Sequence, residues 1–318
     1  MTVQSGGVGV GGAPPPPSMT AAAARGGARD LVTPAERKPS TLVGRLLYFV
    51  GLFTATFIFV FPFVWLVSAS LKTRRDVFSN ELFPMPLHFE NYQRIFEVVP
   101  LASWFTNSTI IAILAALTVT LSSAAVAFGF AYFRFPFRNV LFGLVLASMM
   151  LPGAVMMIPN FLIWNGLGQV NSPVFTPLWA GNLFGSAFYI FLLRQFFLGL
   201  PRELFEAARV DGASYPRMFW SVALPLTRAA LIVVFVFELR ASWTDLLRPL
   251  IFLRDLDLFT LPQGLQYLVR LYNPQVGGQG DFQLVMAASV LITLPMIVVF
   301  FLAQRYFIEG IATTGSKG

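Results

Sequence analysis

Long apolar runs separated by short charged segments form the dominant pattern of this chain. A helix needs about 20 predominantly apolar residues to cross the hydrocarbon core of a bilayer. Six segments meet this requirement, and they cover residues 46–71, 106–132, 140–159, 178–200, 222–243 and 284–307. The pattern therefore predicts an all-α membrane protein with six transmembrane helices.

The third and fourth of these helices come from one long uncharged run, residues 139–193. The run is too long for one span and fits two. Proline and asparagine residues between about 152 and 177 mark the expected connection, because such residues favour turns and breaks. Pro295 lies inside the last predicted span, where packing against neighbouring helices can tolerate a kink.

Composition supports a membrane protein and excludes several site chemistries. Of the 318 residues, 56% are hydrophobic and only 12% are charged, against about a quarter charged in a soluble domain. The chain contains no cysteine and a single histidine, His88. Disulfides, thiolate metal sites and multi-histidine metal clusters are therefore excluded within one chain, and no metal ligands are expected.

The charges predict how the spans are oriented. The side of the membrane that carries the N-terminal segment has a charge balance of +8, and the opposite side has −1. The positive-inside rule then places both termini and the loop 201–221 in the cytoplasm. It also explains the net charge of +7 without nucleic-acid binding. Lys72, Arg74 and Arg75 oppose the rule locally, because this topology exports them.

Two regions are expected along the chain. Residues 1–40 are rich in Gly, Ala and Pro and lack a periodic apolar face, so we expect a disordered cytoplasmic tail. The first apolar run is too long for a secretory signal. Residues 41–318 form the predicted transmembrane domain, and residues 201–221 form its charged, helix-prone cytoplasmic loop.

The loop 201–221 predicts a short helix followed by a sharp turn. Pro201 suits a first helical turn, and Gly212 can adopt the positive φ that ends a helix. The resulting helix of about ten residues would be about 15 Å long. Ser214 and Pro216 suit the opening of the next helix. A short helix in a loop between two spans is common and need have no special role.

The spacing of residues inside this loop is more specific than its helical character. Glu206-Ala207-Ala208 is followed by Gly212, and nine residues later comes the segment Val222-Ala223-Leu224-Pro225. This spacing resembles the EAA loop of ABC importer permeases, E-A-A-x3-G-x9-I-x-L-P, with Val222 in place of Ile. Residues 242–253 and 304–318 resemble further segments of the carbohydrate-type permeases of the maltose and glycerol-3-phosphate group. Thr244 and Leu246 depart from the usual Asn and aromatic residue there.

The resemblance extends from about residue 41 to the C-terminus and implies the shorter of two permease subunits, with a type I ABC importer transmembrane domain. It implies a bacterial plasma-membrane assembly containing a second permease, an ATPase dimer, an extracytoplasmic substrate-binding protein and membrane lipid. No cofactor is expected in this chain, which lacks a G-x4-G-K-[ST] loop; ATP and Mg would bind to the ATPase. The residues implied to couple to the ATPase are Leu204, Phe205, Glu206, Ala207, Ala208, Asp211, Gly212, Leu224 and Pro225. Phe205 or Leu204 would be buried in the ATPase.

Candidate residues for the substrate pathway lie on the fourth and fifth spans. Asn182, Ser186 and Tyr189 have the spacing of one helical stripe, which suits either contact with a sugar or hydrogen bonds between helices. Glu238 is a charged residue inside a span and is a functional candidate for that reason. The simpler interpretation is that Glu238 and Arg240 lie at the external end of the helix, where they reach towards water or contact the neighbouring permease. Trp243 supplies an aromatic face.

The resemblance implies that the chain is the transmembrane subunit of a binding-protein-dependent, ATP-driven sugar importer without catalytic activity of its own. An ABC permease for a peptide or a phosphate ester is the alternative. A stand-alone secondary transporter would favour an inverted repeat and ionisable residues in several spans, and a membrane enzyme would need a cluster of polar catalytic residues. The sequence shows neither pattern.

Overall fold

Helices make up most of the part of the chain that the structure describes. The structure is a computed structural model that describes residues 41–273 and 280–312, so the expected tail of residues 1–40 lies outside the described residues. Within these ranges no strand is present. The longest helices are α2 (Leu42–Ser70), α4 (Leu101–Tyr132) and α15 (Phe282–Ala312). The predicted all-α architecture is confirmed.

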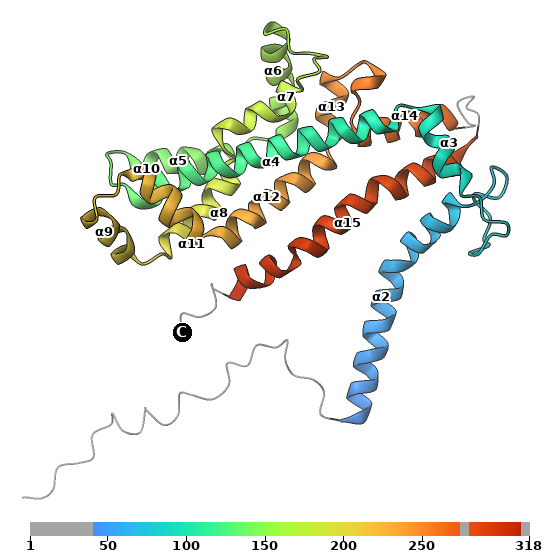
Figure 1. Cartoon of the computed structure of the whole chain (residues 1–318), viewed down its shortest axis with the longest axis horizontal. Helices are drawn as coiled ribbons and strands as arrows, with labels where there is room; N and C mark the ends of the chain where they lie inside the picture. Colours follow the sequence, from blue (N-terminus) through green and yellow to red (C-terminus); the bar gives the residue numbers. More distant parts are fainter. Residues whose placement is uncertain (1–40, 274–279, 313–318) are drawn as a thin grey trace, which may run out of the picture. The chain divides into compact units, whose positions relative to one another are not determined.

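The remaining elements are short, and several follow one another with hardly a break (Figure 1). In chain order they are α3 (Glu90–Val98), α5 (Arg138–Ser148), α6 (Gly153–Gly166), α7 (Thr176–Trp179), η2 (Ala180–Phe184), α8 (Ala187–Leu198), α9 (Arg202–Val210), α10 (Tyr215–Met218), η3 (Phe219–Ala223), α11 (Leu224–Leu226), α12 (Arg228–Trp243), α13 (Leu247–Phe252), η4 (Leu256–Leu258) and α14 (Leu261–Tyr272). The chain divides into two compact units at Val60–Phe61. The features discussed below lie in the second unit.

The helices account for up to six membrane spans. Four segments are long and apolar enough to cross a membrane, namely residues 42–70, 101–132, 176–198 and 282–306. Two pairs of helices are bent at a short break: α5 and α6 meet at 96°, and the segment 215–226 meets α12 at 82°. With each bent pair counted as one span, the number equals the predicted six.

The expectation of one continuous span over residues 140–159 is wrong. The α5 helix ends at Ser148, and α6 begins at Gly153 after Pro152, which has extended backbone angles. A proline disfavours helical geometry in the residue before it and donates no hydrogen bond itself. The apolar run therefore continues through the break, while the helix does not.

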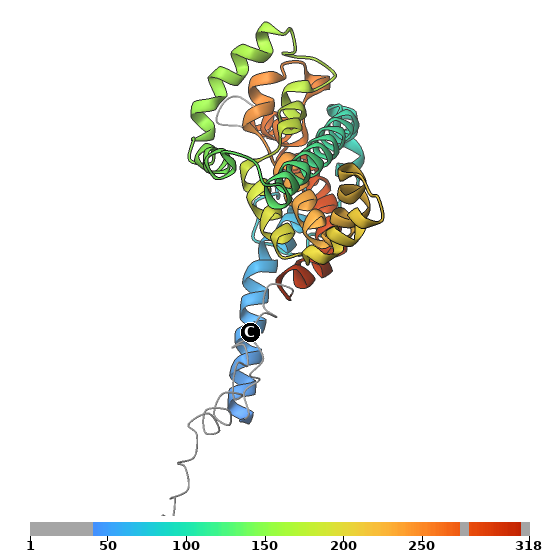
Figure 2. The ribbon, with the colours of Figure 1, turned by 90° about the vertical axis from the view of Figure 1, so that its left-hand side faces the viewer.

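The second unit is organised around α4, which packs against both α8 and α12. Figures 1 and 2 show α4 running alongside α12 through the bundle. The contact surface of α4 carries many small side chains, and Ala115, Ala116, Ala124 and Ala127 are all fully buried. Small residues allow close approach of helix backbones, which is how helices pack in a membrane where lipid is as apolar as the side chains.

One end of α4 is tied to the segment between α13 and α14. The indole nitrogen of Trp104 donates to the carbonyl oxygen of Leu256 at 2.7 Å, and the amide of Asn107 donates to the carbonyl of Asp257 at 2.8 Å. Gly264 packs directly on Trp104, because an added Cβ would lie 2.1 Å from the indole ring. This end of the bundle therefore depends on a glycine.

The buried position of Lys72 accounts for part of the positive charge that opposes the positive-inside rule. Lys72 is only 1% exposed, and its Nζ donates to the carbonyl of Ser79 at 2.8 Å. The Asn91 amide donates to the carbonyl of Ser70 at 2.9 Å and holds α3 to the end of α2. Lys72 is a structural donor that closes the loop after the first span.

Candidate functional site

The α9 helix has well-defined ends that the sequence predicted closely. It follows Pro201 and ends before Gly212, whose φ is +80°. The amide of Gly212 donates to the carbonyl of Arg209 at 3.0 Å, and the amide of Ala213 donates to the carbonyl of Ala208 at 2.9 Å. These are the two hydrogen bonds of a Schellman motif, which requires a left-handed residue at this position. The predicted role of Gly212 is confirmed.

Phe205 fixes α9 to the bundle. Its side chain is only 5% exposed, and its ring centroid lies 5.3 Å from that of Tyr132 and 6.0 Å from that of Phe128 on α4. Of the two residues expected to be buried in the ATPase, Phe205 is instead buried against this chain, and Leu204 is the one that remains exposed. The spacing of residues within one helix does not show which surface an apolar side chain will contact.

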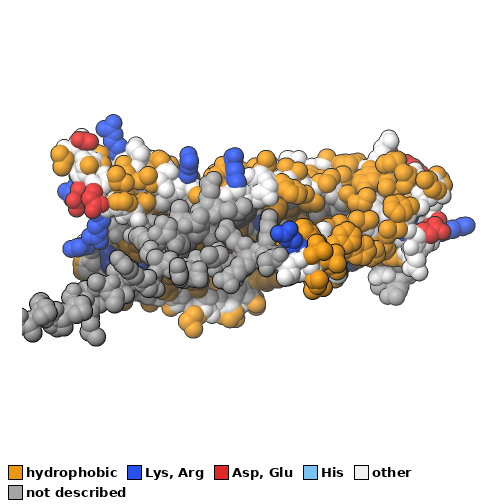
Figure 3. Space-filling view, turned by 90° about the horizontal axis from the view of Figure 1, so that it is seen from below, with side chains coloured by type: hydrophobic (Ala, Val, Ile, Leu, Met, Phe, Trp, Pro, Cys, Tyr) orange, Lys and Arg blue, Asp and Glu red, His pale blue; other side chains and the backbone are white. Residues whose placement is uncertain are grey.

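The opposite face of α9 is open. Leu204 is 43% exposed and Val210 is 88% exposed. Ala207 and Asp211 are also exposed, and so is Glu206, which borders the cavity beneath the helix. Figure 3 shows acidic and basic side chains gathered at its left-hand end, where Figure 1 places α9. A helix that is anchored on one side and exposes both apolar and charged side chains on the other can bind another protein.

Glu206 lacks an intrachain ion pair among the described residues. It lines a cavity under α9 together with Arg202, without pairing with it. Arg202 and Glu206 lie four residues apart, a spacing at which opposite charges on a helix can pair, but the two side chains form no ion pair.

The segment after α9 returns the chain to the bundle. Ser214 takes the predicted N-cap position of α10, without a capping hydrogen bond from its side chain. Met218 and Ala223 are fully buried. Leu224 is half-buried and Pro225 is exposed, and the helix breaks at Thr227, whose hydroxyl donates to the carbonyl of Ala223 at 2.8 Å. The loop is thus fixed on both sides of α9.

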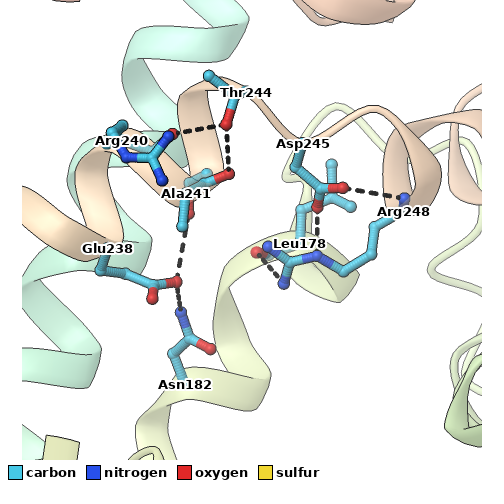
Figure 4. Close-up of polar contacts among 9 residues, drawn as sticks. Leu178, Asn182, Glu238, Arg240, Ala241, Thr244, Asp245 and Arg248 are labelled. Carbon is cyan, nitrogen blue, oxygen red and sulfur yellow. Dashed lines mark hydrogen bonds and ion pairs between the residues drawn. The ribbon is translucent and has the colours of Figure 1, made fainter. Parts of the chain in front are cut away.

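A second group of polar side chains lies inside the bundle between η2 and α12 (Figure 4). The amide nitrogen of Asn182 donates to Oε1 of Glu238 at 3.0 Å, and the hydroxyl of Ser242 donates to the same oxygen at 3.3 Å. Glu238 therefore contacts Asn182 and Ser242, and no ion pair with Arg240 is present.

The expected helical stripe of Asn182, Ser186 and Tyr189 is also wrong. Asn182 lies in η2, Gly185 has φ +80°, and Ser186 is the extended residue before α8. The helix is interrupted between the first two members of the stripe, so they do not share one helical face. The Ser186 amide donates to the hydroxyl of Ser123 at 3.0 Å, and Gly185 packs closely on Ser123.

Tyr189 and Trp243 are packed into the bundle and offer little surface to a solute. Both side chains are buried. The indole nitrogen of Trp243 donates to the carbonyl of Ile292 on α15 at 3.2 Å. Trp243 therefore links α12 to α15. Of the candidate pathway residues, Asn182 and Glu238 are hydrogen-bonded to each other.

Sequence reasoning missed several contacts that connect distant segments. The hydroxyl of Ser122 donates to the carbonyl of Asn182 at 2.8 Å. Asp245 and Arg248 form a close ion pair, and Arg248 also reaches the carbonyl of Leu178 (Figure 4). Nothing in the local pattern signals which carbonyls in other segments these side chains contact. Among the described residues, no group of three or more His, Asp or Glu side chains could hold a metal ion.

A bundle of bent candidate spans with a short helix fixed outside it is the arrangement expected of the transmembrane subunit of a transporter. Comparison with known families agrees with this class. The family model described as "Binding-protein-dependent transport system inner membrane component" matches residues 122–313. The chain belongs to this family, and it is a multi-pass component of the bacterial inner membrane.

Characterised relatives match over nearly their whole length. The chain is 34% identical to the arabinooligosaccharides transport system permease protein AraQ of Halalkalibacterium halodurans, over 89% of this chain and 100% of the relative. It is 31% identical to the lactose transport system permease protein LacG of Rhizobium radiobacter, over 80% and 90%. It is 32% identical to the sn-glycerol-3-phosphate transport system permease protein UgpE of Yersinia enterocolitica, over 82% and 94%.

A solved structure shares the fold. A chain of a bacterial ABC transporter involved in the import of the acidic polysaccharide alginate superimposes with a TM-score of 0.72, covering 85% of this chain and 100% of that chain at 22% identity. The predicted fold class, the transmembrane domain of a type I ABC importer, is thereby confirmed.

Proposed function

We propose that this chain forms one half of the translocation pathway of a binding-protein-dependent importer for a sugar or oligosaccharide. Its partners are a second permease, an ATPase dimer that binds ATP and Mg, and an extracytoplasmic substrate-binding protein. The names of the relatives AraQ and LacG support a carbohydrate. The relative UgpE supports a phosphate ester as the alternative substrate.

The proposal rests mainly on the way α9 is anchored to the bundle. The helix is capped at Gly212 and anchored through Phe205, while Leu204 and Val210 remain exposed. A partner that binds the exposed face of α9 can therefore move the bundle without first bending the loop 201–221. Burial of a side chain such as Leu204 in the ATPase would contribute about 1.5–3 kcal/mol to the contact.

Within the assembly, Glu206, Ala207, Ala208 and Asp211 form the rest of the coupling surface. The small alanine side chains allow a partner backbone to approach closely, and Glu206 has no intrachain ion pair among the described residues that a partner would have to break. Nucleotide-driven closure of the ATPase dimer would pull two such helices together. The spans would then reorient around the polar group at Glu238, which lines the pathway with Asn182.

The direct test is co-purification. The full chain is expressed with its neighbouring reading frames, and the membrane complex is purified through a tag on this chain. We expect an ATPase to co-purify, and Glu206→Lys to abolish its retention while the chain remains in the membrane. Full ATP-dependent transport by Glu206→Lys would contradict the proposal. The ligand held by the accompanying binding protein distinguishes a sugar from a phosphate ester.

A further inference from the structure

A cavity lies between α9 and the bundle, beneath the face of α9 that holds Phe205. Its volume is about 380 Å³. Its walls come from the end of α4, the end of α8, α9 itself and Tyr215. The inner wall is aromatic: the Phe128 and Phe197 rings lie 5.8 Å apart, and the Phe133 and Tyr215 rings lie 5.0 Å apart.

The rim of the cavity is strongly basic. Three guanidinium groups and one carboxylate line it, which gives a net charge of +2, and they belong to Arg134, Arg202, Arg209 and Glu206. Across the described chain, none of the three arginines takes part in an ion pair. Arg209 lies 5.8 Å from the ring centroid of Tyr215. The rim therefore keeps a net positive charge, and none of its three arginines is held by a carboxylate of the described chain.

The cavity lies where two candidate spans end, which is where a membrane surface is expected. Two spans end beside it, since α4 ends at Tyr132 and α8 ends at Leu198. Arg134 also lines a neighbouring hollow whose other residues include the exposed Phe137 and Val140. Arginine and aromatic residues together are typical of the boundary between hydrocarbon and water. The charge distribution assigns this boundary to the cytoplasmic side.

We propose that this cavity binds the phosphate of an anionic phospholipid from the cytoplasmic leaflet. Arginine forms bidentate, charge-assisted hydrogen bonds with phosphate, and basic pockets between helices on this side of a membrane suit anionic headgroups. The aromatic wall suits the glycerol backbone and the first methylenes of a lipid. A small soluble phosphate would use the arginines and leave this wall in water, so the lipid fits the cavity better.

The phosphate of a lipid bound in this way would link α9 to the bundle through ionic contacts with arginines from both. Arg202 lies on α9, whereas Arg134 lies on the loop that follows α4. One phosphate shared by the two side chains would hold α9 against α4 in addition to the Phe205 contact. The bilayer's content of anionic lipid would thereby set how firmly the coupling helix is held.

Binding can be measured on the purified full chain without its partners. The chain in detergent micelles is titrated with dioleoyl-phosphatidylglycerol or dioleoyl-phosphatidylcholine, and retained lipid is counted by native mass spectrometry. We expect one phosphatidylglycerol to bind in clear preference to phosphatidylcholine. At a factor of about five per basic residue, R134Q/R202Q should lower this preference about 25-fold.

The matched control removes the same charge from the same side of the membrane. Arg217 and Arg228 are exposed and do not line the cavity, so R217Q/R228Q should keep the preference for phosphatidylglycerol. Equal losses in both double variants, or no preference in the wild-type chain, would overturn the proposal. Displacement of the lipid by millimolar soluble glycerol phosphate would also overturn the assignment to a lipid.

A measurement on the wild-type chain does not depend on whether the variants fold. A phosphatidylglycerol carrying a photoreactive group on its headgroup is cross-linked to the full chain, and the labelled peptides are identified. We expect labelling of residues 128–134 or 197–209. Labelling confined to other segments would contradict the proposal. Because no ATPase is present in either experiment, failure here is distinguishable from failure of the proposed transport function.

Discussion

Truncation of two adjacent side chains of α9 should affect the docking of the helix to very different degrees. Phe205 is 5% exposed and packs against Tyr132 and Phe128, whereas Leu204 is 43% exposed. Replacing a buried phenylalanine by alanine costs about 3–5 kcal/mol, because transfer free energy is lost and a cavity remains. Phe205→Ala should therefore destabilise the docked position of α9 by about this amount. Leu204→Ala should cost roughly 1 kcal/mol at most.

Hydrogen exchange of the peptide covering residues 202–210 measures this difference, since local opening sets the exchange rate. At about tenfold per 1.4 kcal/mol, Phe205→Ala should speed exchange by about 100-fold or more. Leu204→Ala should speed it by about fivefold or less. In the assembled transporter, Leu204→Ala should instead raise the dissociation constant of the ATPase by about 10- to 100-fold.

Phe205→Leu is the control, because it keeps most of the buried apolar volume. Its exchange rate should lie between those of the wild-type chain and Phe205→Ala. Equal exchange in Phe205→Ala and Leu204→Ala would refute the conclusion that Phe205 anchors α9 to the bundle.

Three further substitutions test other parts of the structure. Gly212→Ala introduces a side chain at φ +80°, at a cost of about 1–2 kcal/mol. This variant should lower the amount of solute transported per ATP hydrolysed in reconstituted vesicles. The control Gly168→Ala, at φ +68° outside the loop 201–221, should leave this ratio unchanged. Gly264→Ala places a Cβ 2.1 Å from the indole ring of Trp104 and should lower the midpoint of thermal unfolding. The control Gly129→Ala, whose added Cβ has no neighbouring atom within 4 Å, should leave the midpoint unchanged. Glu238→Ala should slow solute uptake more than Glu238→Gln, which keeps the acceptor oxygen; equal uptake by all three proteins would contradict a pathway role.

The sequence located the spans and the ends of α9 because both depend on local properties. Apolar length determines whether a segment can cross a membrane. Gly212 ends α9 because only a residue that tolerates positive φ fits the Schellman motif. Both features can be read without knowing what the segment packs against.

The errors arose where distant segments decide the outcome. Phe205 occupies an apolar helical position, but its partner surface on α4 lies more than 70 residues earlier in the chain. The stripe of Asn182, Ser186 and Tyr189 assumed a continuous helix, and Gly185 interrupts it. The acceptor role of Glu238 for Asn182 depends on the packing of η2 near α12. Residue spacing within one segment contains none of this information.

The position of α9 on the cytoplasmic side, within reach of an ATPase, is the claim on which the proposed function depends. Since the chain has no cysteine, Val210→Cys introduces a single thiol at a side chain that is 88% exposed. Its reaction with a membrane-impermeant maleimide should occur in inside-out vesicles, fail in intact cells, and slow down when the ATPase is bound. Labelling in intact cells would contradict the account.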